Sequence, residues 1–148
     1  MTIRAALPGD FARLLQIWEA AVRASHDFLT EDDIADIREQ LSDIFPQTED
    51  LVVSTAGMSL VGFMGLCAIT GGKGKVDMLF IDPAFQAQGV GTDLLDYAKS
   101  KYRHLILDVN EQNRKARIFY EKNGFVVMSR SAVDSQGRPL PLLHLRYH

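Results

Sequence analysis

The chain has 148 residues, 47% of them hydrophobic and 24% charged, which is typical of one soluble globular domain over residues 1–148. No apolar run approaches the roughly 20 residues of a membrane span, the N-terminus lacks the apolar stretch of a secretory signal, and Cys67, the single cysteine, excludes an intramolecular disulfide. We therefore expect a cytoplasmic protein, and the net charge of −3 argues against a general nucleic-acid binder.

The first third of the chain predicts a strand over 2–5, an amphipathic helix over 11–24 and a second helix over 31–45. Asp10, after a Pro-Gly turn, can cap the first helix. Thr30 followed by Asp33 resembles a capping box with Asp in the Glu position, and Pro46 ends the second helix.

The remainder predicts strands over 50–55, 59–69, 76–81, 105–109, 125–131 and 140–147, with helices over 90–102 and 113–123. Residues 71–74, Gly-Gly-Lys-Gly, are expected to form a flexible connection, and Gly124 falls where a left-handed helix cap is expected. The order β-α-α-β-β-β-α-β-α-β-β combines a meander with one crossover. We therefore expect an α/β protein (α+β in some schemes) with a mixed sheet and helices on both faces.

A glycine-containing turn, Gln86-Ala87-Gln88-Gly89-Val90-Gly91-Thr92, follows one predicted strand and opens a helix. The first amides of a helix have no internal partners, the helix dipole favours negative charge there, and glycine lets a phosphate approach the backbone. The turn is not a Walker motif, because no Gly-Lys-Ser/Thr is present, and two glycines are too few for a dinucleotide fingerprint. By itself it indicates an anion site, and glycines at a helix start are also explained by chain geometry alone.

Together with two further segments, this turn resembles the GNAT superfamily of N-acetyltransferases. Gln86-x-x-Gly89-x-Gly91 is similar to its acetyl-CoA signature, the strand Asp77–Pro83 is similar to the strand that precedes it, and Asn113-x-x-Ala116-x-x-Phe119-Tyr120-x-x-x-Gly124-Phe125 is similar to a second signature. More narrowly, residues 25–29, 110–113 and 139–145 resemble one bacterial type within the superfamily.

The resemblance implies a GNAT-like fold and a set of residues that bind acetyl-CoA. Backbone amides of the turn would hold the pyrophosphate, the backbone of the preceding strand would bind the pantetheine arm and polarise the acetyl carbonyl, and two parallel strands would splay to admit the cofactor. The implied cofactor-binding residues are Leu79, Phe80, Ile81, Gln86, Ala87, Gln88, Gly89, Val90, Gly91, Thr92, Asn113 and Tyr120. No metal-ligand spacing is present, so no metal is expected.

Tyr120 is the predicted general acid. Attack of an amine on a thioester expels a thiolate, which a positioned phenol can protonate. Periodicity alone favours Tyr120 as a core residue of an amphipathic helix, and the resemblance reverses this and assigns it the catalytic role.

A base is also expected, because an alkyl ammonium, with a pKa of about 10.4, cannot attack while it is protonated. Asp77 matches the strand position where many relatives carry an acidic base, and His26, in a helix-breaking loop, is its rival. Each is otherwise explained as a residue that binds the acceptor or a loop. Cys67 and His144 are weaker candidates, interpreted as a small core residue and an exposed strand histidine.

The sequence therefore predicts an enzyme that transfers acetyl from acetyl-CoA to a primary amine by direct attack in a ternary complex. The acceptor could be a small amine, a protein N-terminus or a lysine, and residues 1–50, with a net charge of −7 against +4 for the rest, favour a cationic one. A non-catalytic acetyl-CoA sensor is the alternative, and a general nucleotide-binding domain is a third. No nucleic-acid or membrane partner is expected, and the sequence does not decide between a monomer and a homodimer.

Overall fold

The computed structural model describes residues 1–25 and 27–148. Seven strands form one mixed sheet in the order β1-β2-β3-β4-β5-β7-β6. The parallel neighbours are β4 and β5, and the other neighbouring pairs are antiparallel. The strands are β1 (Thr2–Ala5), β2 (Asp50–Ala56), β3 (Ser59–Ile69), β4 (Lys73–Ile81), β5 (Leu105–Asn110), β6 (Val126–Ser131) and β7 (Leu142–Tyr147).

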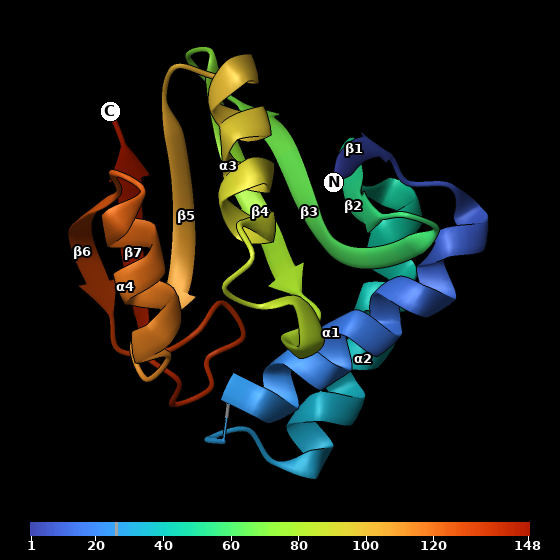
Figure 1. Cartoon of the computed structure of the whole chain (residues 1–148). Coiled ribbons are helices and arrows are strands. Elements are labelled where there is room, and N and C mark those ends of the chain that lie inside the picture. The colour runs from blue at the N-terminus through green and yellow to red at the C-terminus, as the bar shows by residue number, and fades with distance from the viewer. Residues whose placement is uncertain (26) are drawn as a thin grey trace.

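The helices cover both faces of this sheet, as expected. They are α1 (Phe11–Ser25), α2 (Glu31–Ile44), α3 (Val90–Lys101) and α4 (Arg114–Lys122), with short 3-10 turns η1 (Pro8–Asp10), η2 (Phe45–Gln47) and η3 (Pro83–Phe85). The apolar sides of α1 and α2 pack with Phe63 and Met78 on one face. The apolar sides of α3 and α4 pack with Leu107 and Leu145 on the other. In Figure 1, α1 and α2 run side by side, while β6 and β7 lie at the opposite edge of the sheet from β1 and β2.

Local sequence signals explain most element ends. The capping box of α2 is present, since the Thr30 hydroxyl accepts from the Asp33 amide at 3.0 Å and the Asp33 carboxylate accepts from the Thr30 amide at 3.1 Å. Gly124 has φ +92°, the left-handed conformation expected after α4. Asp10, however, does not cap α1. Its carboxylate accepts from the Leu7 amide at 2.8 Å, inside the preceding 3-10 turn.

The predicted flexible connection over 71–74 is partly wrong, because β4 already begins at Lys73. Gly74 pairs with Ala68 on β3 and Leu105 on β5. A Cβ atom on Gly74 would lie 2.4 Å from the Tyr102 ring, so glycine is required here for a close approach and not for a loop. Gly71 and Gly72, which do form the turn, both have positive φ.

An irregularity in β4 prepares the functional region. The β3–β4 register shifts between Gly65, which faces Met78, and Leu66, which faces Val76, so Asp77 is the extra residue of a bulge. As a result Val76 and Met78 pack on opposite faces of the sheet.

The pairing of β4 with β5 ends next to the bulge at Asp77. Its last pair is Val76 with Leu107, although both strands continue. Two parallel strands therefore separate from each other beyond this point. No helix within the described ranges 1–25 and 27–148 is both long and apolar enough to span a membrane.

Candidate active site

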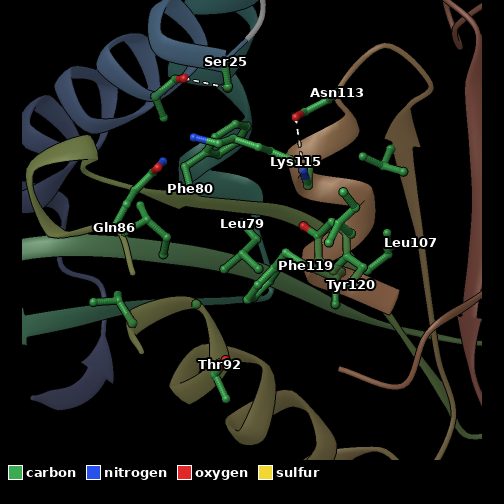
Figure 2. Close-up of a pocket in the computed structure, with 18 of the residues that line it drawn as sticks. Ser25, Leu79, Phe80, Gln86, Thr92, Leu107, Asn113, Lys115, Phe119 and Tyr120 are labelled. Carbon is green, nitrogen blue, oxygen red and sulfur yellow. Dashed lines mark hydrogen bonds between the residues drawn. The ribbon is translucent and has the colours of Figure 1, made fainter. Parts of the chain in front are cut away.

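A cavity of about 710 Å³ lies where β4 and β5 separate. Its lining comes from the end of α1, the second half of β4, the start of α3, the end of β5 and α4. Figure 2 shows Thr92 at one end of the cavity and Ser25 and Asn113 at the other, with Leu79 and Tyr120 between them. The separation of the strands thus creates a space that reaches through the sheet between its two helical layers.

The start of α3 presents backbone to this cavity. Ala87 has φ +63° and Gly89 has φ +84°, so two residues just before the helix have positive φ angles. A Cβ atom at Gly89, the N-cap of α3, would meet nothing within 4 Å, which leaves open space beside this residue. Such a turn at a helix N-terminus is suited to hold a phosphate.

Gly91, the other glycine of the motif, is there for packing. It is buried, and a Cβ atom on it would lie 2.8 Å from the Phe119 ring of α4. The expectation that both glycines serve the close approach of a phosphate is therefore supported by local geometry at Gly89 alone, while Gly91 lets α3 approach α4.

Two amides of β4 point into the gap left by β5. The Asp82 amide donates to the Val61 carbonyl of β3 at 2.8 Å. Because N–H directions alternate along a strand, the amides of Ile81 and Leu79 point away from β3, toward the edge from which β5 has separated. These are the two residues whose backbone is predicted to bind the pantetheine arm and the acetyl carbonyl.

Tyr120 reaches the cavity from α4 through the core. It is 8% exposed, and its ring packs edge-on against Phe119 and Phe125, with centroids 5.3 and 5.8 Å away. Burial raises the pKa of the phenol above its usual value of about 10. The hydroxyl therefore keeps its proton at neutral pH, which is what a group that protonates a leaving thiolate requires.

Asn113 has a structural role that periodicity did not reveal. It is the N-cap of α4, and its side-chain oxygen accepts from the Ala116 amide at 3.2 Å. It also lines the cavity and is 8% exposed. The first residue of the second signature thus fixes the start of the helix that carries Tyr120.

The two predicted bases have different outcomes. Asp77 is exposed and lines the cavity, while His26 lies outside the described residues. Burial, followed by a hydrogen bond to Asp77, raises the pKa of the Cys67 thiol to about 11. Cys67 is therefore a protonated neighbour of Asp77 and not a ready nucleophile.

Nearly all of the other predicted cofactor residues line the same cavity. They are Leu79, Phe80, Ile81, Gln86, Ala87, Gly89, Val90, Gly91 and Thr92. Gln88 is not among the lining residues, and the Val90 side chain is buried in the core, so only its backbone can face a ligand.

Sequence reasoning expected β5 to separate from β4 but missed the polar side chains that β5 and the first turn of α4 place in the cavity. Asp108 and Asn110 line the cavity from β5, and Lys115 lines it from α4. Asp108 interrupts an otherwise apolar strand, and that interruption was the available signal. His144, interpreted as an exposed strand histidine, instead lies with its Nδ1 atom 2.6 Å from the carboxylate of Asp108.

Comparison with known proteins agrees with this geometry. Residues 19–140 match the acetyltransferase (GNAT) domain family. Peptidyl-lysine N-acetyltransferase YjaB of Salmonella typhimurium is 40% identical over 147 residues, which cover 99% of this chain and 98% of that protein. The narrower resemblance to one bacterial type of acetyltransferase is thereby confirmed.

Solved structures show the same fold. The solution structure of the apo form of YjaB from Escherichia coli superposes with a TM-score of 0.86 at 37% identity, covering 99% of this chain and 96% of that one. The PaiA N-acetyltransferase of Thermoplasma acidophilum, solved in complex with coenzyme A, has a TM-score of 0.80 at 22% identity, covering 98% and 96% of the two chains. At that identity the likeness concerns the fold alone.

Proposed function

Because the chain belongs to the GNAT family of acetyltransferases, we propose that its acceptor is the side-chain amine of a protein lysine, which attacks the acetyl thioester with Asp77 as base and Tyr120 as acid. The chain is an N-acetyltransferase that uses acetyl-CoA and acetylates an amine. The prediction of an enzyme is confirmed, and the relatives' names give the alternative, a sensor without turnover, no support. Its location in the cytoplasm stays a prediction.

The cavity fits acetyl-CoA on three independent features of the backbone. Open space lies in front of Gly89, the amides of Leu79 and Ile81 point into the gap, and β4 and β5 have separated there. Amides at the start of α3 would hold the pyrophosphate, and those of β4 would hold the pantetheine arm and the acetyl carbonyl. Bound there, acetyl-CoA supplies an acetyl group activated as a thioester.

Tyr120 would donate a proton to the departing sulfur. Its raised pKa, which burial alone accounts for, keeps the hydroxyl protonated. Asp77 would receive the acceptor amine and take its proton. Cys67 does not line the cavity, which favours direct attack in a ternary complex over an acetylated enzyme.

The single observation that carries the proposal is that Asp77, Tyr120 and the turn at Gly89 line one cavity. A carboxylate for an ammonium, an acid for a thiolate and an anion site are therefore within reach of one another. The choice of lysine among amines follows from YjaB of Salmonella typhimurium, a peptidyl-lysine N-acetyltransferase that aligns with 99% of this chain.

Two matched peptides test this choice. One has a blocked N-terminus and a single lysine, and the other has a free N-terminus and no lysine. We expect release of coenzyme A and a mass gain of one acetyl group on the lysine peptide, at least about tenfold faster than on the other, because a long flexible amine can enter the cavity. Equal or reversed rates would contradict the lysine assignment. Binding of acetyl-CoA with no turnover of either peptide or of small amines would indicate a sensor.

A further inference from the structure

Three polar side chains form a continuous hydrogen-bonded array across β5, β7 and β6. The His144 Nδ1 atom lies 2.6 Å from the Asp108 carboxylate, and its Nε2 atom lies 2.6 Å from the Ser131 hydroxyl. Asp108 and His144 are directly paired across the two strands. Asp108 and His144 alternate along their strands with residues such as Leu107 and Leu145, which are buried against α3 and α4, and Ser131 is bonded to His144. The array therefore lies on the other face of the sheet.

This combination of residue types resembles a hydrolytic triad, but its placement excludes that role. Ser131 and His144 do not line the cavity, and β7 and β5 lie between β6 and β4 in the sheet. The Ser131 hydroxyl consequently has no access to the place where an acyl group would be bound. Only the Asp108 end of the array lines the cavity, so any effect on the reaction passes through that carboxylate.

The Asp108 carboxylate at one end of the array and the Ser131 hydroxyl at the other determine where the hydrogens lie. A carboxylate can only accept, so the His144 Nδ1 atom carries a hydrogen and donates it to Asp108. In the neutral ring the Nε2 atom then accepts from the Ser131 hydroxyl, which selects that tautomer. Ser131 thus orients His144, and His144 orients the carboxylate of Asp108.

Asp108 keeps one oxygen available for a ligand. Its Oδ1 atom is held by His144, while its Oδ2 atom lies 3.9 Å from the Lys75 ammonium, beyond hydrogen-bonding distance. The side chain is 36% exposed. Asp77 stands on the neighbouring strand, one residue past the last β4–β5 pair, just as Asp108 does. The carboxylates of Asp77 and Asp108 therefore both line the cavity where the strands separate, together with the side chain of Lys115.

We propose that Asp108 binds the ammonium group of the acceptor, and that His144 and Ser131 are positioning residues for its carboxylate. This inference rests on the proposed function, since it needs an acceptor that arrives as a cation. Asp108 then selects the charged amine from solution, and Asp77 is adjacent to take its proton. The array gives the enzyme a preference for cationic acceptors that the acetyl-CoA half of the cavity does not supply.

The test is the KM of the lysine peptide in Asp108→Asn. We expect that KM to rise about tenfold, while kcat and the KM of acetyl-CoA stay within about twofold, because an amide keeps the shape of the side chain and loses its charge. Asp96→Asn, on the exposed side of α3, is the matched control and should leave all three values unchanged. An unchanged peptide KM in Asp108→Asn, or an equal rise in the KM of acetyl-CoA, overturns the proposal.

The positioning role has its own readout. His144→Ala should raise the peptide KM several-fold at unchanged kcat, and His144→Asn should restore it, because the asparagine amide can donate where Nδ1 did. An unchanged peptide KM in His144→Ala, or an equal rise in His144→Asn, overturns the assignment of His144. A wild-type enzyme that acetylates no lysine peptide overturns the proposed function and this inference with it, whereas turnover with an unchanged KM in Asp108→Asn overturns the inference alone.

Discussion

The two halves of the cavity are built in different ways. The acetyl-CoA half consists mainly of backbone, namely the turn at Gly89 and the amides of β4, and its parts lie within a few residues of one another. The acceptor half consists of side chains such as Asp77, Asp108 and His144, brought together by strand register from distant parts of the chain. A backbone site can be recognised as a short sequence motif because it needs particular backbone angles. A site of side chains that strand pairing brings together has no such local motif.

The largest effect is expected from a substitution that disrupts the acetyl-CoA half of the cavity and leaves the acceptor half intact. Gly89→Glu places a side chain on a residue with φ +84° and a negative charge in front of the first amides of α3. We expect the affinity for acetyl-CoA to fall about 100-fold or more, since both strain and charge repulsion oppose binding. Isothermal titration calorimetry measures this directly, and unchanged affinity would remove the phosphate site from this turn.

Gly91→Ala is the matched control from the same motif. Its Cβ atom would meet the Phe119 ring at 2.8 Å, so the cost falls on the packing of α3 against α4. We expect a loss of about 1–3 kcal/mol in the free energy of unfolding, with the affinity for acetyl-CoA much less affected than in Gly89→Glu. If the two variants behaved alike, the two glycines would share one role.

The next effect is expected at Tyr120, where the two halves meet. Tyr120→Phe removes the proton donor and keeps the ring that packs against Phe119 and Phe125. We expect kcat to fall about 100-fold, as for loss of a general acid, with the affinity for acetyl-CoA nearly unchanged. Steady-state kinetics and calorimetry on one preparation separate the two quantities, and full activity would eliminate Tyr120 as the acid.

The contrast also explains how far sequence reasoning reached. Helical periodicity and the capping box at Thr30 gave α1 and α2 nearly to the residue, and two signatures gave the cavity lining around Gly89 and Tyr120. Gly74 was misread as part of a loop because the Tyr102 ring that requires it lies 28 residues away. Asp108 was missed because its meaning depends on His144, which is 36 residues away in the chain.

The segment between β6 and β7, over 132–141, is likewise held by residues distant in the chain, since it joins the acceptor half to α2. Arg138 lies within 3.7 Å of Asp33 and 3.9 Å of Asp36, and its side chain is 18% exposed. A second contact joins Gln136 to Gln40 of α2 at 2.8 Å. Nothing in the local sequence of this segment predicts that it docks on a helix about 100 residues earlier.

The smallest expected effect comes from loosening this contact with Arg138→Gln. Long, partly exposed ion pairs contribute well under about 1 kcal/mol each, so the free energy of unfolding should change little. The KM of the lysine peptide should rise about threefold, because the segment would have to be ordered when the acceptor binds, while the KM of acetyl-CoA should not change. Arg103→Gln, an exposed residue before β5, controls for lost positive charge. A matching rise in the KM of acetyl-CoA would mean that the two halves of the cavity are not independent, and the comparison between a backbone half and a side-chain half would then fail.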